Sequence, residues 1–523
     1  MRPIVRVILI LALLATALAG CRPFDQAEAP GKGWDRLARH VPAESETILF
    51  FDLKPGPELA PHWDRIRRRL AETPAGRTLL AQMLAPFKSD LFDIDHALQG
   101  PAVSGQDDSA SFVIYQVADE AAALETMLDS QGDASAWNRK TYQGKLLYHG
   151  RIGQSPGDSL YVAWTIEDSL LFLISDRSFG VTAELERLLD LIQADSLEAL
   201  PAWLKLRDEL PDPLLGLVFM PMPESTRRRV DDDTTSQATS LDEQVGALAL
   251  ALLPQAQGLR VELYAPFRTG IGSMPEYRNL LDLPPVASQA WAGLPADTVL
   301  ALSSHDAHTL WPWEQALVSI GVLPSLVPQI NGLDLEADLL TADGPLSGAF
   351  TLAVSPPLPD QSLVDNLPAL QLLLVAPDAS PAQAEGLHAA MEARGTVFGS
   401  DRVEGVDIQK QVGTAATGYA LAYGFDEGRF HLGSSPQILA AAFAARRDGD
   451  GLADWAAFPT VAQALPADPA LAVFLNVPAL FKLARANMPG DELQAEEAYQ
   501  ILSTFEAIGL GLRLRPDQAD GVL

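Results

Sequence analysis

Cysteine and basic residues are scarce in this sequence. Its 523 residues include a single cysteine, and 37 lysines and arginines stand against 68 aspartates and glutamates, which gives a net charge of −31. A chain this acidic repels phosphate backbones, so nucleic acid is excluded as a partner. Hydrophobic residues make up 48% of the chain, a fraction typical of globular proteins that excludes collagen-like, coiled-coil and wholly disordered chains.

The motifs of the common catalytic sites are also missing. The sequence has no Gly-x-Ser-x-Gly nucleophile elbow, no Gly-x-x-x-x-Gly-Lys-Ser/Thr phosphate loop, no Gly-x-Gly-x-x-Gly fingerprint and no His-Glu-x-x-His zinc motif. We therefore expect no catalytic residue, no cofactor and no metal. A hydrolase built from residues outside these motifs is an alternative, because a fold alone does not exclude activity.

Long hydrophobic runs are absent except at the N-terminus. There, Arg2 and Arg6 precede the apolar run Val7–Leu18, and two small residues follow it. This is the pattern of a signal peptide, which we place at residues 1–20. No other window approaches 18 consecutive apolar residues, so we expect the rest of the chain to be extracytoplasmic.

The signal peptide ends in Leu18-Ala19-Gly20-Cys21, which resembles the lipobox of bacterial lipoproteins. The resemblance implies that the Cys21 thiol takes a diacylglyceryl group and that acyl chains such as palmitate anchor the protein to a membrane. A lipidated Cys21 leaves the mature protein without a thiol, which excludes disulfides and thiolate catalysis. The alternative is an unmodified cysteine behind an ordinary cleaved signal.

The residues after the cysteine bear on location and flexibility. Arg22 occupies the position where lipoproteins of the inner membrane usually carry aspartate, so the resemblance implies the outer membrane in a host that has two. Residues 21–40 include two prolines and two glycines between Pro23 and Gly33. We predict that this segment is a flexible tether from the lipid anchor to the first domain.

The remaining sequence contains a long internal repeat. Val41-Pro42-Ala43-Glu44 precedes one short apolar run and Leu294-Pro295-Ala296-Asp297 precedes another, with the prolines 253 positions apart. Leu210-Pro211-Asp212 and Leu465-Pro466-Ala467-Asp468 form a second such pair, 255 positions apart. Because the period greatly exceeds that of solenoid repeats, it indicates two sister domains. We place repeat domain 1 at 41–267, a linker at 268–293 and repeat domain 2 at 294–523.

Each copy has the same predicted elements in the same order. A strand and a helix are followed by a second strand and helix, then by three strands and a third helix. We predict that Tyr142–His149 and Val403–Val412 are equivalent single strands. A hairpin of Gly246–Leu253 with Leu259–Tyr264 closes copy one, and we predict that Asp520-Gly521 forms the matching turn in copy two.

These patterns define a fold class. Neighbouring strands with helices inserted between groups of them are typical of an α+β fold. We therefore expect two tandem homologous domains, each a mainly antiparallel sheet with helices packed on one face.

A family resemblance rests on the repeated Leu-Pro-Ala-Asp segments and on Leu-Gly-Ser-Ser-Pro at residues 432–436, which opens an alanine-rich helix. These features resemble a family of bacterial envelope proteins known only as a domain of unknown function, and the resemblance covers roughly residues 41–523. The first copy departs from the pattern at Ser175-Asp176-Arg177. The resemblance implies no activity, and it assigns no catalytic residue.

Two short clusters have the residue types of a metal or acid–base site. His305, Asp306 and His308 would place two imidazoles three residues apart, but this segment aligns with a strand-to-helix turn in copy one, and Asp306 is more simply a helix cap. The second cluster consists of Asp93, Asp95 and His96. Its partner in copy two has no histidine, so we interpret it as a charged turn.

The other candidate residues have structural interpretations. Ser434 and Ser435 precede Pro436, which favours helix capping over a nucleophile. His149 and His431 lie within strand patterns and are expected to be packed or surface residues. Two arginine clusters, Arg65 with Arg67–Arg69 and Arg227–Arg229, would suit anionic lipid headgroups, but we interpret them as solvated surface charge, which needs no such role.

We therefore expect a lipid-anchored envelope protein with a non-catalytic binding or scaffold role. A carrier of a lipid or other apolar ligand is the main alternative, because the interface between two sister domains is a preferred ligand site. A carrier requires an apolar cavity well above about 300 Å³, whereas a scaffold requires filled domains and an exposed apolar patch. The expected partners are the membrane and either an envelope protein or an apolar ligand.

Overall fold

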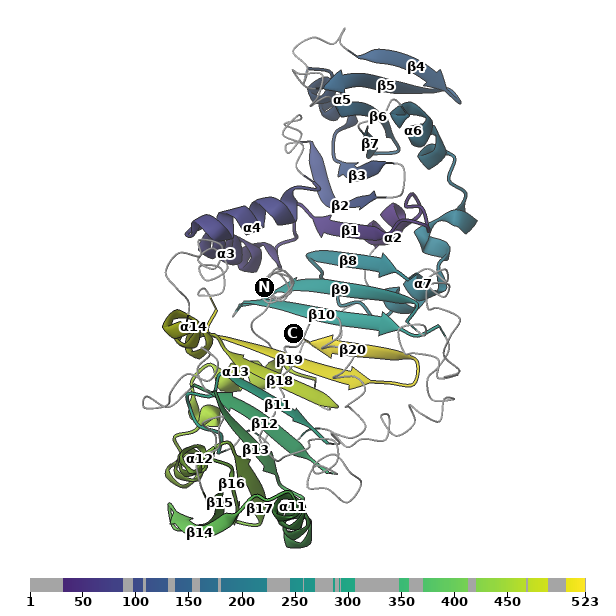
Figure 1. Ribbon diagram of the computed structural model, residues 1–523. Helices are drawn as coiled ribbons and strands as arrows, with labels where there is room; N and C mark the ends of the chain where they lie inside the picture. The colour runs from purple at the N-terminus through teal and green to yellow at the C-terminus, as the bar shows by residue number, and fades with distance from the viewer. Residues whose placement is uncertain are drawn as a thin grey trace.

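The computed structural model describes residues 32–87, 97–106, 110–129, 137–152, 160–176, 180–222, 245–256, 258–268, 286, 291, 293–305, 348–356, 370–412, 420–466, 469–487 and 505–522. In these residues twenty strands form one continuous sheet in which every pairing is antiparallel. Figure 1 shows a long twisted sheet with β4 near one end and β14 near the other. The predicted α+β class with antiparallel strands is confirmed.

Ten strands come from the first half of the chain and ten from the second. Those of the first half are β1 (Thr47–Asp52), β2 (Leu98–Gln106), β3 (Ser111–Val117), β4 (Asn138–Tyr142), β5 (Lys145–Ile152), β6 (Leu160–Glu167), β7 (Leu170–Asp176), β8 (Gly216–Pro221), β9 (Ala247–Pro254) and β10 (Leu259–Pro266). Those of the second half are β11 (Leu300–Ser304), β12 (Phe350–Ser355), β13 (Gln371–Ala376), β14 (Phe398–Val403), β15 (Val406–Gln411), β16 (Ala422–Asp426), β17 (Arg429–Gly433), β18 (Leu471–Asn476), β19 (Ala507–Leu514) and β20 (Gln518–Val522).

The order of strands across the sheet repeats. From one edge the first half runs β4-β5-β6-β7-β3-β2-β1-β8-β9-β10. The sheet then continues as β20-β19-β18-β11-β12-β13-β17-β16-β15-β14. Each strand of the second half thus mirrors the strand numbered ten lower. The two halves meet at one seam, the antiparallel pair β10–β20, in which Tyr264 lies opposite Asp520.

Smaller features repeat with the strands. Pro42 forms an isolated bridge with Ser196, and Pro295 forms the equivalent bridge with Gly451. The repeated strand starts therefore occupy matching positions in the fold. Because one sheet runs through both halves, however, the division into two tandem domains remains a prediction.

Helices cover both faces of the sheet, so the prediction that they pack on one face is wrong. Successive residues of a strand point to opposite faces. In β1, Phe50 stacks on Trp203 with ring centroids 5.3 Å apart, whereas Phe51 contacts Trp63 at 5.7 Å. In the second half Ala301 and Leu302, neighbours on β11, likewise belong to different core clusters, so each half has an apolar core on both faces.

The described α-helices are α2 (Lys32–Ala38), α3 (Ala60–Ala71), α4 (Pro74–Leu84), α5 (Glu120–Asp129), α6 (Val181–Leu189), α7 (Pro201–Arg207), α11 (Pro381–Ala393), α12 (Pro436–Asp448), α13 (Phe458–Ala464) and α14 (Val477–Asn487). In the first half, buried residues of α2, α6 and α7 share one core cluster with Phe50. Buried residues of α3, α4 and α5 share the opposite cluster with Phe51.

The predicted flexible tether is wrong for its last residues. Helix α2 occupies Lys32–Ala38, and Leu37 and Ala38 are fully buried. Trp34 contacts Phe50 with ring centroids 5.3 Å apart. Apolar residues at positions 34, 37 and 38 have the three-and-four spacing of a helix face, and this spacing outweighs the prolines and glycines before it. Residues 21–31 lie outside the described residues.

Two predicted strands are in fact hairpins. A turn at Gln143 and Gly144 separates β4 from β5, and a turn at Glu404 and Gly405 separates β14 from β15. The two residues of each turn have positive φ, of 48° and 82° in the first and 49° and 87° in the second. Consecutive left-handed residues are the geometry of tight hairpin turns.

The predicted turn at Asp520-Gly521 is also wrong. Both residues lie inside β20 and pair with β10 on one side and β19 on the other. The hairpin turn comes earlier, where the Arg515 amide donates to the Gln518 carbonyl at 2.8 Å. The dipeptide is typical of a hairpin turn, but here strand pairing on both sides holds it in β20. The Asp520 side chain also accepts hydrogen bonds from two arginines in this position.

Candidate functional site

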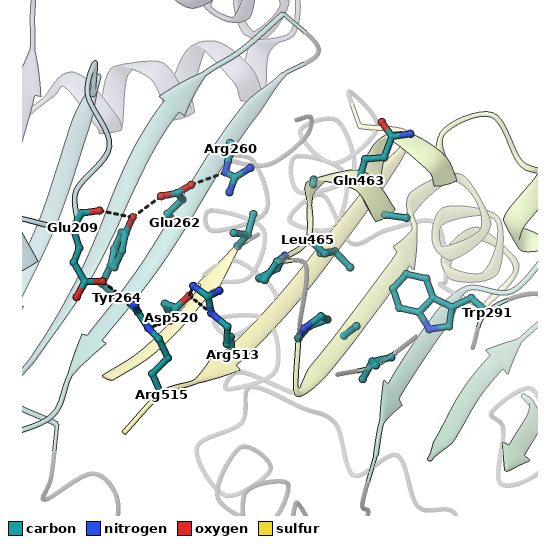
Figure 2. Close-up of a pocket in the computed structure, with 18 residues that line it drawn as sticks. Glu209, Arg260, Glu262, Tyr264, Trp291, Gln463, Leu465, Arg513, Arg515 and Asp520 are labelled. Atoms are coloured by element: carbon teal, nitrogen blue, oxygen red, sulfur yellow. Dashed lines mark hydrogen bonds and ion pairs between the residues drawn. The ribbon is translucent and has the colours of Figure 1, made fainter. Parts of the chain in front are cut away.

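A cavity of about 1000 Å³ lies at the seam between the halves. Its floor is formed by β10, β20 and β19, and its walls come from α13, the turn that follows α13, and Glu209 just beyond α7. Figure 2 shows charged side chains gathered at one end of the cavity and Trp291 at the other. The volume is at the upper end of the range of ligand pockets.

Two glycines of β19 allow the wall to approach the floor. A Cβ atom on Gly509 would lie 2.2 Å from Cγ1 of Val461 in α13, and one on Gly511 would lie 2.5 Å from Cδ of Pro466. Neither distance is compatible with a side chain, so glycine is required for this packing. The Gly-x-Gly spacing on one face of β19 therefore sets the position of α13 and Pro466 beside the cavity.

The charged end begins on β10. Arg260, Glu262 and Tyr264 alternate along the strand and so point to the same face. Arg260 Nε donates to Glu262 Oε1 at 2.7 Å, and the Tyr264 hydroxyl donates to Glu262 Oε2 at 2.5 Å. Both oxygens of Glu262 therefore accept a hydrogen bond.

The second half contributes a matching group around Asp520. Arg513 Nη2 donates to Asp520 Oδ2 at 2.8 Å, and Arg515 Nε donates to Asp520 Oδ1 at 2.9 Å. Arg515 also pairs with Glu209, which accepts a further hydrogen bond from the Gln518 amide. Because Glu209 belongs to the first half, this ion pair joins the two halves across the cavity edge.

Burial changes the acidity of two groups at this end. It raises the pKa of Glu209, an effect that Arg515 opposes. Burial, together with the neighbouring Glu262, raises the pKa of Tyr264, so its hydroxyl stays protonated and acts as a donor. At this end of the cavity the carboxylates therefore hold the arginines in place through charge-assisted hydrogen bonds, and the Tyr264 hydroxyl holds Glu262.

The other end of the cavity is apolar. Its lining residues there include Val286, Trp291, Ala462, Leu465, Pro466, Pro469 and Ala472. The Trp291 ring is 3% exposed and meets Phe458 edge to face at 5.3 Å. Its indole N–H donates to the Ser303 hydroxyl, 2.5 Å away, which fixes the ring at the cavity wall.

Part of the predicted linker 268–293 thus belongs to the core. Val286 donates its amide to the Pro469 carbonyl at 2.9 Å, and Trp291 is buried. The linker prediction is wrong at these two positions, because their apolar side chains pack against the second half. Residues 269–285 lie outside the described residues.

Many of the residues that sequence patterns singled out lie outside the described residues. These are Cys21, Asp93, Asp95, His96, Arg227, Arg228, Arg229, Asp306 and His308. His305 directly follows β11 and is partly buried. Within the described ranges, no group of three His, Cys, Asp or Glu side chains could hold a metal ion.

Ser434 and Ser435 are both buried, and the predicted helix cap is confirmed at Ser435. The Ser435 hydroxyl accepts from the Ile438 amide at 3.3 Å and caps α12, with Pro436 at the first helical position. The Ser434 hydroxyl accepts from the Leu372 amide at 2.9 Å. Both hydroxyls therefore serve the backbone at the junction of β17, β13 and α12.

The two strand histidines differ in burial. His149 lies on β5 and is partly exposed, whereas His431 on β17 is 4% exposed and meets Phe443 edge to face at 5.1 Å. Burial lowers the pKa of His431 to about 4, and the nearby Arg446 and Arg429 act in the same direction. The hydrogen bond between its Nδ1 and the Arg429 carbonyl, at 3.1 Å, opposes the shift.

Replacing His431 with glutamine is expected to remove an acid-dependent loss of stability. Between pH 6.5 and about 4 the unfolded chain binds a proton at this residue that the folded chain does not bind. The contribution of His431 to the free energy of unfolding is therefore at its maximum above pH 6.5, and it falls by about 3 kcal/mol as the pH drops to 4. Urea unfolding of both proteins at pH 7 and pH 4.5 measures the difference.

His149→Gln is the matched control for the histidine substitution. It removes a partly exposed histidine from a strand of the same sheet. If His431→Gln loses as much stability between pH 7 and pH 4.5 as the unsubstituted protein does, His431 is not the titrating group.

The arginines of α3 are exposed, and three of them have hydrogen-bond or ion-pair partners. Arg67 pairs with Asp64 at 2.9 Å, Arg68 donates to the Asp64 carbonyl at 3.2 Å, and Arg65 donates to the Ala256 carbonyl. Arg69 is exposed. These contacts agree with solvated surface charge, and a lipid-headgroup role for the cluster remains a prediction.

None of the cavity residues was identified from the sequence as a candidate. A signal was present, because Arg260-x-Glu262-x-Tyr264 and Arg513-x-Arg515 place charges on one face of otherwise apolar strands. Alternating charges within apolar strands indicate a solvated or ligand-facing surface. The convergence of the two segments depends on the β10–β20 pairing, which the sequence does not reveal.

Comparison with known proteins gives a family but no activity. A model of the DUF3352 family, described as a protein of unknown function, matches residues 93–515. Three crystal structures of TP0453 are similar in part. Form IV has 11% identity, covers 45% of this chain and 83% of that chain, and has a TM-score of 0.24. Form III has 12% identity, covers 48% of this chain and 88% of that chain, and has a TM-score of 0.25. Form I has 11% identity, covers 48% of this chain and 87% of that chain, and has a TM-score of 0.25.

No curated protein sequence matches the chain. Among the described residues, no helix has the length and apolar character needed to cross a bilayer. The predicted resemblance to a family of unknown function is confirmed, whereas its envelope location remains a prediction. Because the family model spans most of its length, the chain belongs to the DUF3352 family of proteins of unknown function.

Proposed function

We propose that this protein is an extracytoplasmic binding protein, anchored to a membrane through lipid on Cys21, that holds an amphipathic ligand in the cavity at its seam. The observation that carries the proposal is the cavity itself, which is about 1000 Å³ in volume and has one charged end and one apolar end. A scaffold with filled domains would not require such a space. The cavity therefore favours the carrier alternative over the scaffold.

The walls of the cavity support binding of a ligand with an apolar part. Small residues such as Ala462, Ala464 and Ala472 line it beside Leu465 and Trp291, which leaves room while keeping the surface apolar. The floor consists of strands hydrogen-bonded on both sides. A rigid site loses little conformational entropy when a ligand binds.

The membrane anchor gives the proposed binding a location. A lipid on Cys21 would hold the protein at a membrane surface, and the resemblance to a lipobox supports a surface outside the cytoplasm. In a host with two membranes we propose the outer one, on the identity of Arg22. A ligand with an apolar part is available at such a surface.

Filling the cavity is expected to abolish ligand retention. Ala464 is the last residue of α13, lines the cavity and is partly exposed, so Ala464→Trp adds an indole there with little effect on the core. Cys21→Ser protein is incubated with a lipid extract of the host envelope and weighed by native mass spectrometry, then again after denaturation. We expect an added mass that denaturation removes, and at least about tenfold lower occupancy in the Ala464→Trp variant.

Ala441→Trp is the matched control, because Ala441 is exposed on α12 and does not line the cavity. It should retain the added mass at the level of the Cys21→Ser protein. The proposal would be contradicted if the Cys21→Ser protein without a tryptophan substitution showed only the mass of the polypeptide. Equal loss of the added mass in Ala464→Trp and Ala441→Trp would also contradict it. The scaffold role would then be pursued by crosslinking to neighbouring proteins.

A further inference from the structure

We propose that the ligand carries an oxyanion, a carboxylate or phosphate attached to an apolar chain, and that Arg260 binds this group at the charged end of the cavity. The inference rests on the proposed function and adds the chemical class of the ligand. It is carried by the hydrogen-bonding capacity that remains at this end after the internal pairs are formed.

Two of the three carboxylates at this end are paired at both oxygens. Both oxygens of Glu262 accept, one from Arg260 and one from Tyr264. Both oxygens of Asp520 also accept, one from Arg513 and one from Arg515. A ligand that donated hydrogen bonds to Glu262 or Asp520 would therefore meet a carboxylate that already has donors at both oxygens.

The arginines retain unused donors. A guanidinium has five N–H groups. Among the described residues, Arg260 pairs with Glu262 alone and through Nε alone, so both of its terminal nitrogens remain for a ligand. Arg515 uses Nε and Nη2 for Asp520 and Glu209, which leaves Nη1. The charged end thus retains cationic donors, which match an oxyanion.

The arginines are more exposed than the carboxylates with which they pair. The side chain of Arg513 is 34% exposed against 11% for Asp520, and that of Arg260 is 21% exposed against 16% for Glu262. Although the formal charges of these pairs cancel, the guanidinium groups are the more accessible members of each pair.

The rest of the cavity fixes the orientation of such a ligand. Val522, Leu465, Pro466 and Trp291 are among the apolar lining residues, and Figure 2 shows Leu465 between the charged end and Trp291. An apolar chain attached to the oxyanion would follow this path. Each added methylene buried along it should tighten binding about fourfold, because burying one stabilises the complex by about 0.8 kcal/mol.

Three probes that share a 16-carbon chain test the inference with the Cys21→Ser protein. They are hexadecanoate, hexadecyl phosphate and hexadecanol, each titrated below its aggregation concentration. We expect at least one anion to bind about tenfold or more tightly than the alcohol, because hydrogen bonds to charged groups are the strong ones. The stronger of the two anions distinguishes a carboxylate head from a phosphate head.

Substitution of Arg260 separates recognition of the head from binding of the chain. Arg260→Gln should reduce affinity for the preferred anion about tenfold and leave hexadecanol binding unchanged, which also shows that the variant is folded. Arg260→Lys should recover part of the lost affinity, because lysine keeps the positive charge but cannot bind the oxyanion through two parallel N–H groups as a guanidinium does. Arg69→Gln on the exposed face of α3 is the control and should change nothing.

Two results would overturn the inference, and they differ in their bearing on the proposed function. Equal binding of all three probes with no effect of Arg260→Gln rejects the oxyanion but leaves an apolar carrier, provided that Ala464→Trp still blocks binding. Failure of every probe to bind, together with no envelope-derived mass in the native spectrum, rejects both.

Discussion

Replacing Cys21 with serine is expected to transfer the protein from the membrane fraction to the soluble fraction. Without the thiol no diacylglyceryl group can be attached, and each buried methylene of such a group contributes about 0.8 kcal/mol to membrane binding. We expect the ratio of membrane-bound to soluble protein to fall at least about a hundredfold. The measurement is fractionation of cells that express the variant behind a signal peptide of the ordinary cleaved type, so that no apolar run remains.

Ala29→Ser provides a matched control, since it makes a similar change in the same segment and leaves residues 18–21 intact. It should remain in the membrane fraction. Cys21→Ser protein that stays with membranes after a high-salt wash would contradict lipid anchoring. Metabolic labelling with a radioactive fatty acid checks the same point, because label should appear in the control and not in Cys21→Ser.

Replacing Trp203 with alanine is expected to cause the largest loss of folding stability. Trp203 on α7 is fully buried, stacked on Phe50 at 5.3 Å and edge to face with Phe219 at 5.4 Å. Deleting a ring this large leaves a cavity among packed aromatic residues, which typically lowers the free energy of unfolding by about 3–5 kcal/mol. Urea unfolding with an intrinsic fluorescence readout measures the change.

Leu204→Ala is the matched control on the same helix, because Leu204 is 40% exposed and should lose well under half as much stability. A third variant tests the origin of the effect. Within the described residues the Trp203 indole N–H has no hydrogen-bond partner, so Trp203→Phe should lose less than Trp203→Ala. Equal losses at positions 203 and 204 would show that burial of the Trp203 ring does not determine the result.

The repeat and the fold class could be predicted from the sequence because local signals carried them. The prolines that precede a strand in each copy, Pro42 and Pro295, could be recognised as a repeated sequence pattern. In the structure the two prolines form equivalent isolated bridges. The Ser435 cap with Pro436 behind it was similarly local. Each of these features depends on a few neighbouring residues.

The hairpins at the two sheet ends were missed because their turns lack the usual dipeptides. Gln143-Gly144 and Glu404-Gly405 use a long polar residue where Asn or Asp is expected at the first left-handed position. The opposite error occurred at Asp520-Gly521, a favourable dipeptide that lies within a strand. In each case the pairing of neighbouring strands overrides the preference of the dipeptide.

The cavity could not be predicted, because its parts meet only through long-range pairing. Arg260 and Arg513 are separated by about half of the chain, and Glu209 reaches Arg515 from the other half. The charge alternation on each strand was readable, but nothing in either segment indicates the other. The site therefore arises from topology more than from any motif.

The seam has a further consequence for how the protein folds. Strands β10 and β20 are joined by pairs such as Leu263 with Gly521, which are separated by some 250 residues, whereas the other strands pair within their own halves. Contacts so distant in the chain form late. Until β20 arrives, β10 is an open sheet edge that can accept the equivalent strand of a second copy. An exchanged dimer of this kind would contain two complete seams, so slow refolding at high protein concentration should favour domain-swapped assemblies over monomers.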